Sequence, residues 1–397
     1  MIFSRVINFN VLVLVTLFMF LSACQSTSLQ RTNIQPNYSD LYLDDAFKQK
    51  HSIESAEEVF AIDDEMKRMV TEKLLPIRNS KERAKELLMH LFSKENINLA
   101  YKNSANLTAI EAYHNHMANC MSLTIMAYAL ANEAELDVKF QDVKVPEYWV
   151  RNGQYNMLTG HVNLVLTEPR TPGTTIVYGK DLLQIDFDPT MYKNSFPKKI
   201  VEKSTVLAMF YNNKGAEALI AKKYALAYSY LREATIVDPM FSPAWGNLGI
   251  LYKLNDHRSA AKKTYQHAIL LDKDNLTALS NLSYLAKAEG DIEQVQKIEH
   301  LLHEKRNKNP YYHALLADEA FFRGQNTVAL KLYKKAIRMN KKVHEFYFGL
   351  AKVYYSLDDI PRAERAMKKA LLYNKTSTTE HQYLAKLDFL RQVEVRH

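Results

Sequence analysis

The residues that decide the fold are Trp245-Gly-Asn-Leu-Gly-Ile-Leu-Tyr252 and, shortly after them, Ala261-Lys-Lys-Thr-Tyr-Gln-His-Ala268. The spacing of the large residues in the first block and of the small residues in the second places each set on one face of a helix. Small residues let two helices approach closely, and large ones fill the space between neighbouring hairpins. The segment therefore predicts a helical hairpin that packs against others of its kind.

This hairpin recurs every 34 residues, which is a strong indication of a repeat array. The first large position falls on Tyr211, Trp245, Leu279, His313 and Tyr347. The two small positions fall on Ala227, Ala261, Val295, Ala329 and Ala363, and on Ala234, Ala268, Leu302, Ala336 and Ala370. The pattern resembles the tetratricopeptide repeat (TPR) family, which implies an all-α solenoid with a concave surface for a peptide or partner protein.

The third of the five units departs from the pattern, because Val295, Glu299 and Leu302 replace the usual small-aromatic-small set. We expect the array to bend there. Residues 377–397 carry an amphipathic pattern and are expected to form a capping helix and tail. His313 stands at a packing position and is interpreted as a core histidine.

The start of the chain predicts export and anchoring. Residues 1–23 combine a basic start, a short apolar core and small residues, which is typical of a secretory signal peptide. The sequence Leu21-Ser-Ala-Cys24 resembles the lipobox of bacterial lipoproteins, which implies lipidation of Cys24 and membrane attachment through it. Residues 24–45 would be the lipidated cysteine and its tether. Because Gln25 rather than Asp follows the cysteine, the outer membrane, facing the periplasm, is favoured.

Between the tether and the repeats, residues 46–208 predict a domain of the α+β class. Helical periodicity covers about residues 53–98, 108–118 and 118–131, and it then gives way to an alternating pattern. The alternating stretches are residues 138–145, 161–166, 174–178 and 182–188. Helices followed by an antiparallel sheet are the expected layers. The repeats would then occupy residues 209–376.

Three residue types in this domain have the order needed for nucleophilic catalysis. Cys120 falls at the start of an apolar helix, where the helix dipole and free N–H groups lower a thiol pKa and can hold an oxyanion. His161 opens a strand directly after Gly160, and Asp186 or Asp188 closes a later one. A nucleophile, a base and an orienting carboxylate are the parts of an acyl-transfer site.

The same residues resemble the transglutaminase-like superfamily, whose fold is papain-like and some of whose bacterial members carry TPRs. The matching motifs are Asn119-Cys-Met-Ser-Leu-Thr124, Gly160-His-Val-Asn163 and Asp188-Pro-Thr190. The resemblance implies that Cys120 is the nucleophile, His161 the general base and Asp188 the orienting residue. Asp186 lies on the same side of the strand and remains an equal alternative. The implied chemistry is amide hydrolysis or transamidation through an acyl-thioester.

Competing interpretations remain open. A lone cysteine on an apolar helix also fits a small buried side chain, and the domain would then be a degenerate module on a TPR scaffold. Asn119 and Ser122 fit helix capping or packing, and His114 and His116 fit a surface or substrate rim, since no metal-ligand spacing accompanies them. No cofactor or metal is expected. The net charge of +8 is spread thinly along helices, so nucleic acid is not an expected partner.

Overall fold

The protein is described here from a computed structural model that divides into two units, residues 1–42 and 43–397. It describes residues 38–48, 51–92, 100–101, 106–115, 117–152, 155–166, 184–185, 196–374 and 377–394. Cys24, His116, Asp186 and Asp188 lie outside the described residues. In the first unit, the described residues form one 3-10 turn, η1 (Ser39–Leu41).

The N-terminal part of the second unit begins with short helices, whose starts follow from capping residues. They are α2 (Ala56–Val59), α3 (Asp64–Met69) running into the π-helical turn η2 (Val70–Leu74), α4 (Ser80–Phe92), α5 (Ala109–Asn115) and α6 (Cys120–Glu133). Ser55 and Glu58 form a capping box at the start of α2, and the Asp63 carboxylate accepts from the backbone of Met66. These side chains satisfy N–H groups that a helix leaves unpaired at its first turn.

A four-stranded antiparallel sheet follows these helices, in the order β5-β4-β3-β6. Its strands are β3 (Val138–Asn152), β4 (Tyr155–Leu166), β5 (Gln184–Ile185) and β6 (Lys198–Val201), and a separate parallel pair joins β1 (Ala100–Tyr101) to β2 (Met117–Ala118). Both β3 and β4 run beyond the alternating stretches predicted for them, as a long hairpin whose register shifts between Val143 and Tyr148. The predicted strand at 174–178 lies outside the described residues, and β6 was not predicted.

One hydrophobic core joins this sheet to the helices. Val162 and Leu164 of β4 and Phe140 of β3 pack in a cluster that contains most of the buried apolar side chains of α6. The cluster continues into residues 206–244, which belong to the first repeat helices. The core therefore does not stop at the predicted boundary at residue 208.

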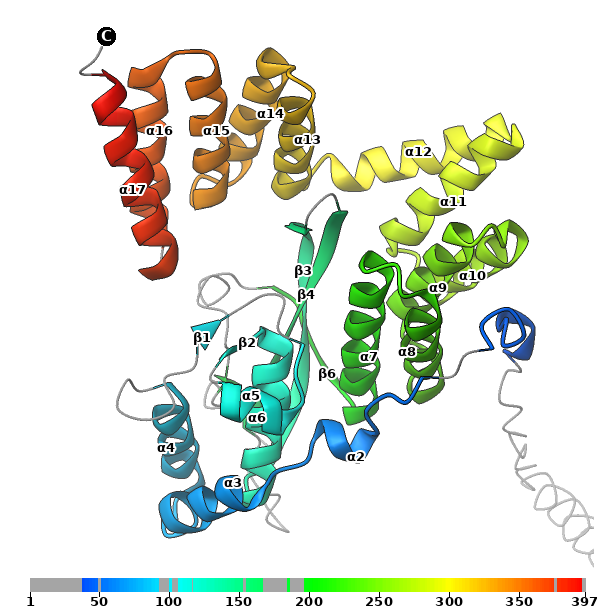
Figure 1. The fold of residues 1–397 in the computed structure, drawn as a ribbon, viewed down its shortest axis with the longest axis vertical. Coiled ribbons are helices and arrows are strands. Elements are labelled where there is room, and N and C mark those ends of the chain that lie inside the picture. Colours follow the sequence, from blue (N-terminus) through cyan, green and yellow to red (C-terminus); the bar gives the residue numbers. More distant parts are fainter. Residues whose placement is uncertain are drawn as a thin grey trace, which may run out of the picture. The chain divides into compact units, whose positions relative to one another are not determined.

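Helical hairpins with short connections make up the rest of the chain (Figure 1). The successive pairs are α7 (Lys203–Ile220) with α8 (Tyr224–Val237), α9 (Ser242–Leu254) with α10 (Arg258–Leu271), α11 (Leu276–Glu289) with α12 (Ile292–Arg306), α13 (Pro310–Phe322) with α14 (Asn326–Met339), and α15 (His344–Ser356) with α16 (Ile360–Tyr373). The described chain is thus mostly helical, with a repeat solenoid in its C-terminal part.

The predicted packing positions of the repeats are buried, except Leu302 of the third unit, which is partly exposed. Trp245, Tyr211 and Tyr347 lie in the core, as do the alanines at the small positions. Gly249 allows the ring of Tyr265 to lie against the backbone of α9, where a methyl group would overlap it. The apolar contact surfaces between packed helices, called seams below, therefore recur with the 34-residue period.

The junction after the third hairpin contains a contact that does not recur. Helix α13 packs against β3, and Glu147 of that strand forms an ion pair with Arg306 at the end of α12, with a Nε to Oε2 distance of 2.8 Å. The side-chain amide of Asn309 also donates to the backbone oxygen of Glu147, at 2.7 Å. A strand of the preceding sheet therefore takes part in the packing at the irregular unit.

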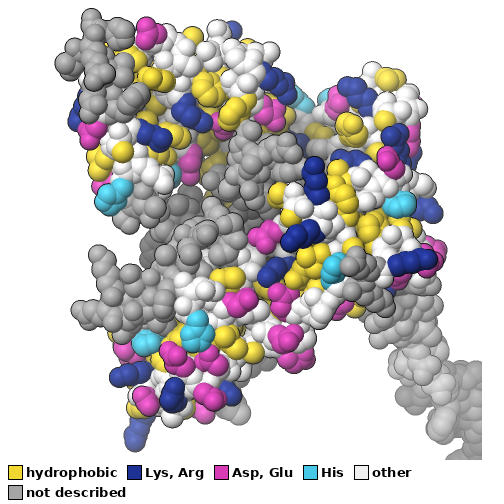
Figure 2. Space-filling model, viewed as in Figure 1, with side chains coloured by type: hydrophobic (Ala, Val, Ile, Leu, Met, Phe, Trp, Pro, Cys, Tyr) yellow, Lys and Arg dark blue, Asp and Glu magenta, His cyan; other side chains and the backbone are white. Residues whose placement is uncertain are grey.

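The array ends in α17 (Ser377–Glu394), which packs on α16. Tyr383, Leu387 and Leu390 are buried in a second hydrophobic cluster that begins at Ala314, whereas Leu384 is largely exposed. Among the residues that the structure describes, no helix is both long and apolar enough to cross a membrane. Figure 2 shows acidic and basic side chains interspersed over the face in view, which agrees with a thinly spread net charge.

Candidate functional site

Cys120 is the first residue of α6, directly after the N-cap Asn119. The Asn119 side-chain oxygen accepts a hydrogen bond from the backbone N–H of Ser122 at 2.9 Å, which orders the first turn. Cys120 is buried, with 9% of its surface exposed. A thiol in this position lies in the positive field of the helix start.

His161 lies on β4 opposite Val143, and the next residue, Val162, has its carbonyl oxygen near Thr124 of α6. The hydroxyl of Thr124 lies 2.7 Å from the Cys120 carbonyl oxygen and 3.2 Å from the Val162 carbonyl oxygen. One side chain thus links the turn of the candidate nucleophile to the residue after the candidate base. Both candidates for the third member, Asp186 and Asp188, lie outside the described residues.

Strand alternation separates His161 from the core beside α6. Val162 and Leu164 point into that core, so His161 and Asn163 lie on the other face of β4. His161 is nevertheless buried, at 4% exposure. The region therefore holds two buried side chains, Cys120 and His161, and Thr124 links the backbone of Cys120 to that of Val162, the residue after His161.

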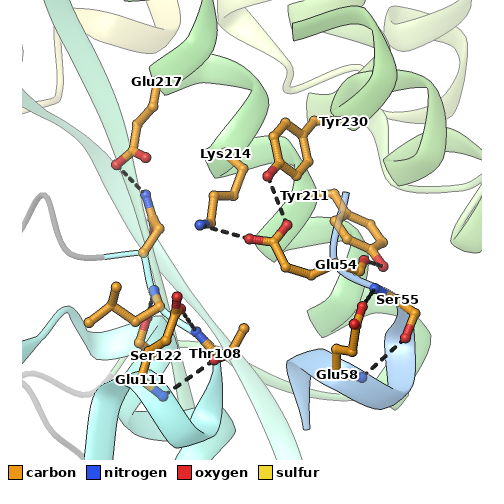
Figure 3. A network of polar contacts seen from close by, with 12 residues as sticks. Glu54, Ser55, Glu58, Thr108, Glu111, Ser122, Tyr211, Lys214, Glu217 and Tyr230 are labelled. Carbon is orange, nitrogen blue, oxygen red and sulfur yellow. Dashed lines mark hydrogen bonds and ion pairs between the residues drawn. The ribbon is translucent and has the colours of Figure 1, made fainter. Parts of the chain in front are cut away.

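A chain of buried amides leads from Asn119 to the first repeat helix. The Asn119 amide nitrogen donates to the side-chain oxygen of Asn106 at 2.5 Å, and the Asn106 amide nitrogen donates to Glu217 Oε1 at 2.6 Å. Figure 3 shows Glu217 on α7 directed toward this segment, with Ser122 below it. The Ser122 hydroxyl accepts from the backbone N–H of Leu107 at 2.7 Å.

Burial acts on the carboxyl group at the end of this chain. Desolvation raises the pKa of Glu217, and the hydrogen bond from Asn106 and the charge of Lys214 offset only part of that rise. A carboxylate in such a place costs free energy to keep ionised. The hydrogen bond from the Asn106 side-chain amide therefore offsets part of the free-energy cost of burying ionised Glu217.

A second carboxylate approaches the same helices from the N-terminal side. Glu54 accepts from the Tyr230 hydroxyl at 2.7 Å and pairs with Lys214 at 3.1 Å, and its backbone oxygen accepts from the Tyr211 hydroxyl at 2.7 Å. Burial alone raises the pKa of Glu54, but these hydrogen bonds and its own backbone N–H outweigh burial, and the net pKa is lowered. No sequence pattern pointed to Glu54, Asn106 or Glu217, because none of them recurs.

The remaining histidine candidates have structural partners. His114 pairs with Asp63, with 2.5 Å between Nε2 and Oδ2, and His313 is a buried repeat residue whose Nε2 lies 2.9 Å from the Asn307 carbonyl oxygen. Burial lowers the pKa of His313. Within the described part of the chain, no cluster of His, Cys, Asp and Glu could hold a metal ion.

The model of the tetratricopeptide repeat family matches residues 242–275, the segment of α9, α10 and the turn after them. The C-terminal part of the chain is a TPR region. Its period, its paired helices and its buried alanines agree with that match. The chain matches no curated protein.

Three similar solved structures each cover less than half of the chain. A chain of the APC/C hetero-tetramer Cut9-Hcn1 is 18% identical over 47% of this chain, with a TM-score of 0.29, and only 37% of that chain is spanned. PilF of Pseudomonas aeruginosa is 16% identical over 48% of this chain and 88% of its own, with a TM-score of 0.29. YrrB, a TPR protein with an unusual peptide-binding site, is 12% identical over 44% and 90%, with a TM-score of 0.25. At these identities and TM-scores the similarity does not extend to a partner or a reaction.

A polar row crosses the first helices of the TPR region. The Asn247 amide of α9 donates to the Asn212 side chain of α7 at 2.8 Å, and Lys253 of α9 donates to the Asn281 side chain of α11 at 2.6 Å. Lys253 also lies over the exposed ring of Tyr284, 5.2 Å from its centroid. Burial lowers the pKa of Lys253.

Proposed function

We propose that this chain is a lipid-anchored protein of the bacterial cell envelope with a Cys-His-Asp acyl-transfer site and a TPR surface that binds a peptide or protein. The observation that supports catalysis is the placement of Cys120 at the start of α6, linked through Thr124 to the strand that carries His161. The resemblance of these motifs to the transglutaminase-like superfamily and its papain-like fold supports the same proposal. Asp186 or Asp188 would orient the histidine.

The proposed reaction begins with attack of the Cys120 thiolate on the carbonyl carbon of an amide. His161 takes the thiol proton and gives it to the departing amine, which leaves an acyl-thioester on the cysteine. The acyl group then passes to water or to another amine, and the thiol is restored. The N–H groups of the first turn of α6 would hold the oxyanion.

A second candidate function is a TPR scaffold or assembly factor with a degenerate cysteine domain. The burial of Cys120 favours it. A buried cysteine commonly packs as a small apolar side chain. In this case the TPR surface alone carries the function.

Labelling of the intact chain with a thiol-directed probe, with the modified residue mapped by mass spectrometry, separates the two. If the site is active, Cys120 reacts rapidly, Cys120→Ala removes the label, and His161→Ala slows labelling at least tenfold. His313→Ala is the matched control, because His313 is also buried at 4% exposure and lies within the TPR region. A Cys120 that reacts no faster than a free thiol, with His161→Ala and His313→Ala equivalent, would reject catalysis.

The TPR surface and the anchor need separate tests. Lys253→Ala with Tyr284→Ala should abolish recovery of a cross-linked envelope partner while Cys120→Ala leaves it intact, if the array binds independently. Cys24→Ala should move the protein from the membrane fraction to the soluble fraction after cell breakage. A Cys24→Ala protein that stays in the membrane would contradict the proposed lipid anchor.

A further inference from the structure

The hydrogen bonds between α7 and the start of α6 have a fixed direction. Glu217, when ionised, only accepts, so Asn106 must present its amide nitrogen to it. The Asn106 oxygen is then left to accept from the Asn119 amide nitrogen. Asn119 in turn must present its oxygen to the N–H of Ser122, which is the orientation that caps α6.

An amide side chain alone has no such preference, because its nitrogen and oxygen are nearly equal in size. The opposite orientation of Asn119 would direct its N–H₂ group at the N–H groups of the helix start and leave the first turn uncapped. Asn106 and Asn119 are both buried, so solvent cannot supply the missing bonds. The acceptor on α7 therefore determines the state of the cap next to Cys120.

We propose that Glu217 and Asn106 are positioning residues for Cys120. The first TPR hairpin, through Glu217 on α7, then contributes to the thiol site. The proposal rests on the proposed function in treating Cys120 as the reactive group. It assigns the first hairpin a task that differs from partner binding: its helix α7 holds the helix of the nucleophile in the capped state. Residues from both sides of the predicted boundary at 208 form this unit, in agreement with their common core.

The predicted consequence concerns the acidity of the thiol. An ordered first turn directs N–H groups and the helix dipole at Cys120, which stabilises the thiolate. Glu217→Ala and Asn106→Ala should let the turn fray, raise the pKa of Cys120 and lower its alkylation rate at neutral pH about fivefold, the size expected for loss of a helix cap. Removal of a nearby negative charge alone would lower the thiol pKa instead. The direction of the shift therefore separates positioning from electrostatics.

The experiment measures the rate at which iodoacetamide modifies Cys120 in the full chain as a function of pH. The midpoint of this profile is the pH at which the rate reaches half of its maximum. Glu217→Gln removes the charge and keeps an acceptor oxygen, so it should restore the wild-type midpoint or shift it downward. Glu299→Gln and Asn132→Ala are the matched controls, because both side chains are exposed and Asn132 lies on α6 itself. Both controls should leave the profile unchanged.

A double variant protects the test against a general loss of folding. Serine is as good a cap as asparagine but cannot reach Asn106, so Asn119→Ser should keep the wild-type profile. In the Asn119→Ser background, Glu217→Ala should no longer raise the midpoint. A midpoint that Glu217→Ala leaves unchanged in the wild-type background, or raises equally in both backgrounds, would overturn the proposal. Failure of the proposed function gives a different result: the thiol probe then labels Cys120 at the same rate in His161→Ala and His313→Ala. The two failures can therefore be told apart.

Discussion

The seams within the repeat array and the seams between the array and the N-terminal residues are built from different chemistry. Inside the array, the buried rings of Tyr265 and Tyr333, which occupy equivalent repeat positions, each lie against a glycine. Where the array meets the preceding residues, single polar side chains such as Glu54, Glu147 and Glu217 make contacts in addition to the shared hydrophobic core. The stability of the apolar seams depends on how well the side chains fit together, whereas that of the polar contacts depends on individual hydrogen bonds and ion pairs.

The difference has an energetic meaning. Burial of apolar surface contributes free energy roughly in proportion to its area and tolerates small changes of orientation. A buried ion pair or amide contributes little net stability but is costly to leave half-satisfied. We expect substitutions in the array seams to affect stability most, and substitutions in the polar seams to depend on pH and on which partner is removed.

The largest expected effect is that of Trp245→Ala. Trp245 is fully buried in the second hairpin, and its removal should leave a cavity that costs about 3–5 kcal/mol of unfolding free energy. The measurement is urea denaturation followed by circular dichroism at 222 nm. Leu270→Ala, in the same hairpin but exposed, should change the free energy by less than about 0.5 kcal/mol. Equal effects from the two variants would show that the seam is not tightly packed.

The next effect concerns close approach at Gly349. A methyl group there would overlap the buried ring of Tyr333, so Gly349→Ala should destabilise the array by about 3 kcal/mol through overpacking. Gly246→Ala is the matched control, because the nearest atoms at that helical glycine lie at ordinary contact distance, 3.4 Å or more. The control should be neutral or stabilising, since alanine favours the helix. Thermal unfolding of both variants checks the contrast.

In the polar seams we expect a smaller and asymmetric effect. Arg306→Ala removes the partner of Glu147, whose side chain is mostly buried, and should cost about 2 kcal/mol. The double variant Arg306→Leu with Glu147→Leu should recover most of that loss, because it leaves no unpaired charge. Arg323→Ala, at an exposed arginine, is the control. A double variant no more stable than Arg306→Ala would contradict the assignment of the loss to an uncompensated charge.

The contrast also explains what could be predicted from the sequence. The repeat helices could be predicted because Ala261, Tyr265 and their counterparts recur, and recurrence makes a weak pattern strong. The apolar helix with Cys120 at its start followed from local periodicity. Asn106 and Glu217 could not be found in this way, since their contact joins residues 111 positions apart and nothing in the local pattern depends on it.

The extent of the strands was missed for a similar reason. The hairpin of β3 and β4 continues past Val143 through a register shift, where alternation no longer indicates a buried face. Its further length is stabilised in part by Glu147 at the irregular third unit of the array, which is a tertiary contact. The predicted bend at that unit and the predicted residue boundaries of the domains stay predictions.

The smallest expected effect is a change in the pH dependence of stability at the seam between residue 54 and the first hairpin. Because the pKa of Glu54 is lowered in the folded state, its stabilising contribution is fully present above its ordinary value of about 4.5 and is lost as the pH falls through the folded pKa. The raised pKa of Glu217 acts in the opposite sense, since protonation at falling pH relieves the cost of burying its charge. Glu54→Gln should therefore reduce stability at pH 7 by about 1 kcal/mol or less and have almost no effect near pH 3.

Glu217→Gln should show the reverse sign, with stability at pH 7 equal to or above that of the wild type, because the amide needs no ionised form. Urea denaturation of both variants at pH 3, 5 and 7 tests the pair, with the exposed Glu299→Gln as the control. The effects of two glutamates that contact the same helices would then differ in sign for a physical reason: the hydrogen bonds and the lysine at Glu54 outweigh its burial, and those at Glu217 do not. The same loss of stability at pH 7 in both variants would show that the two polar contacts do not differ in this way.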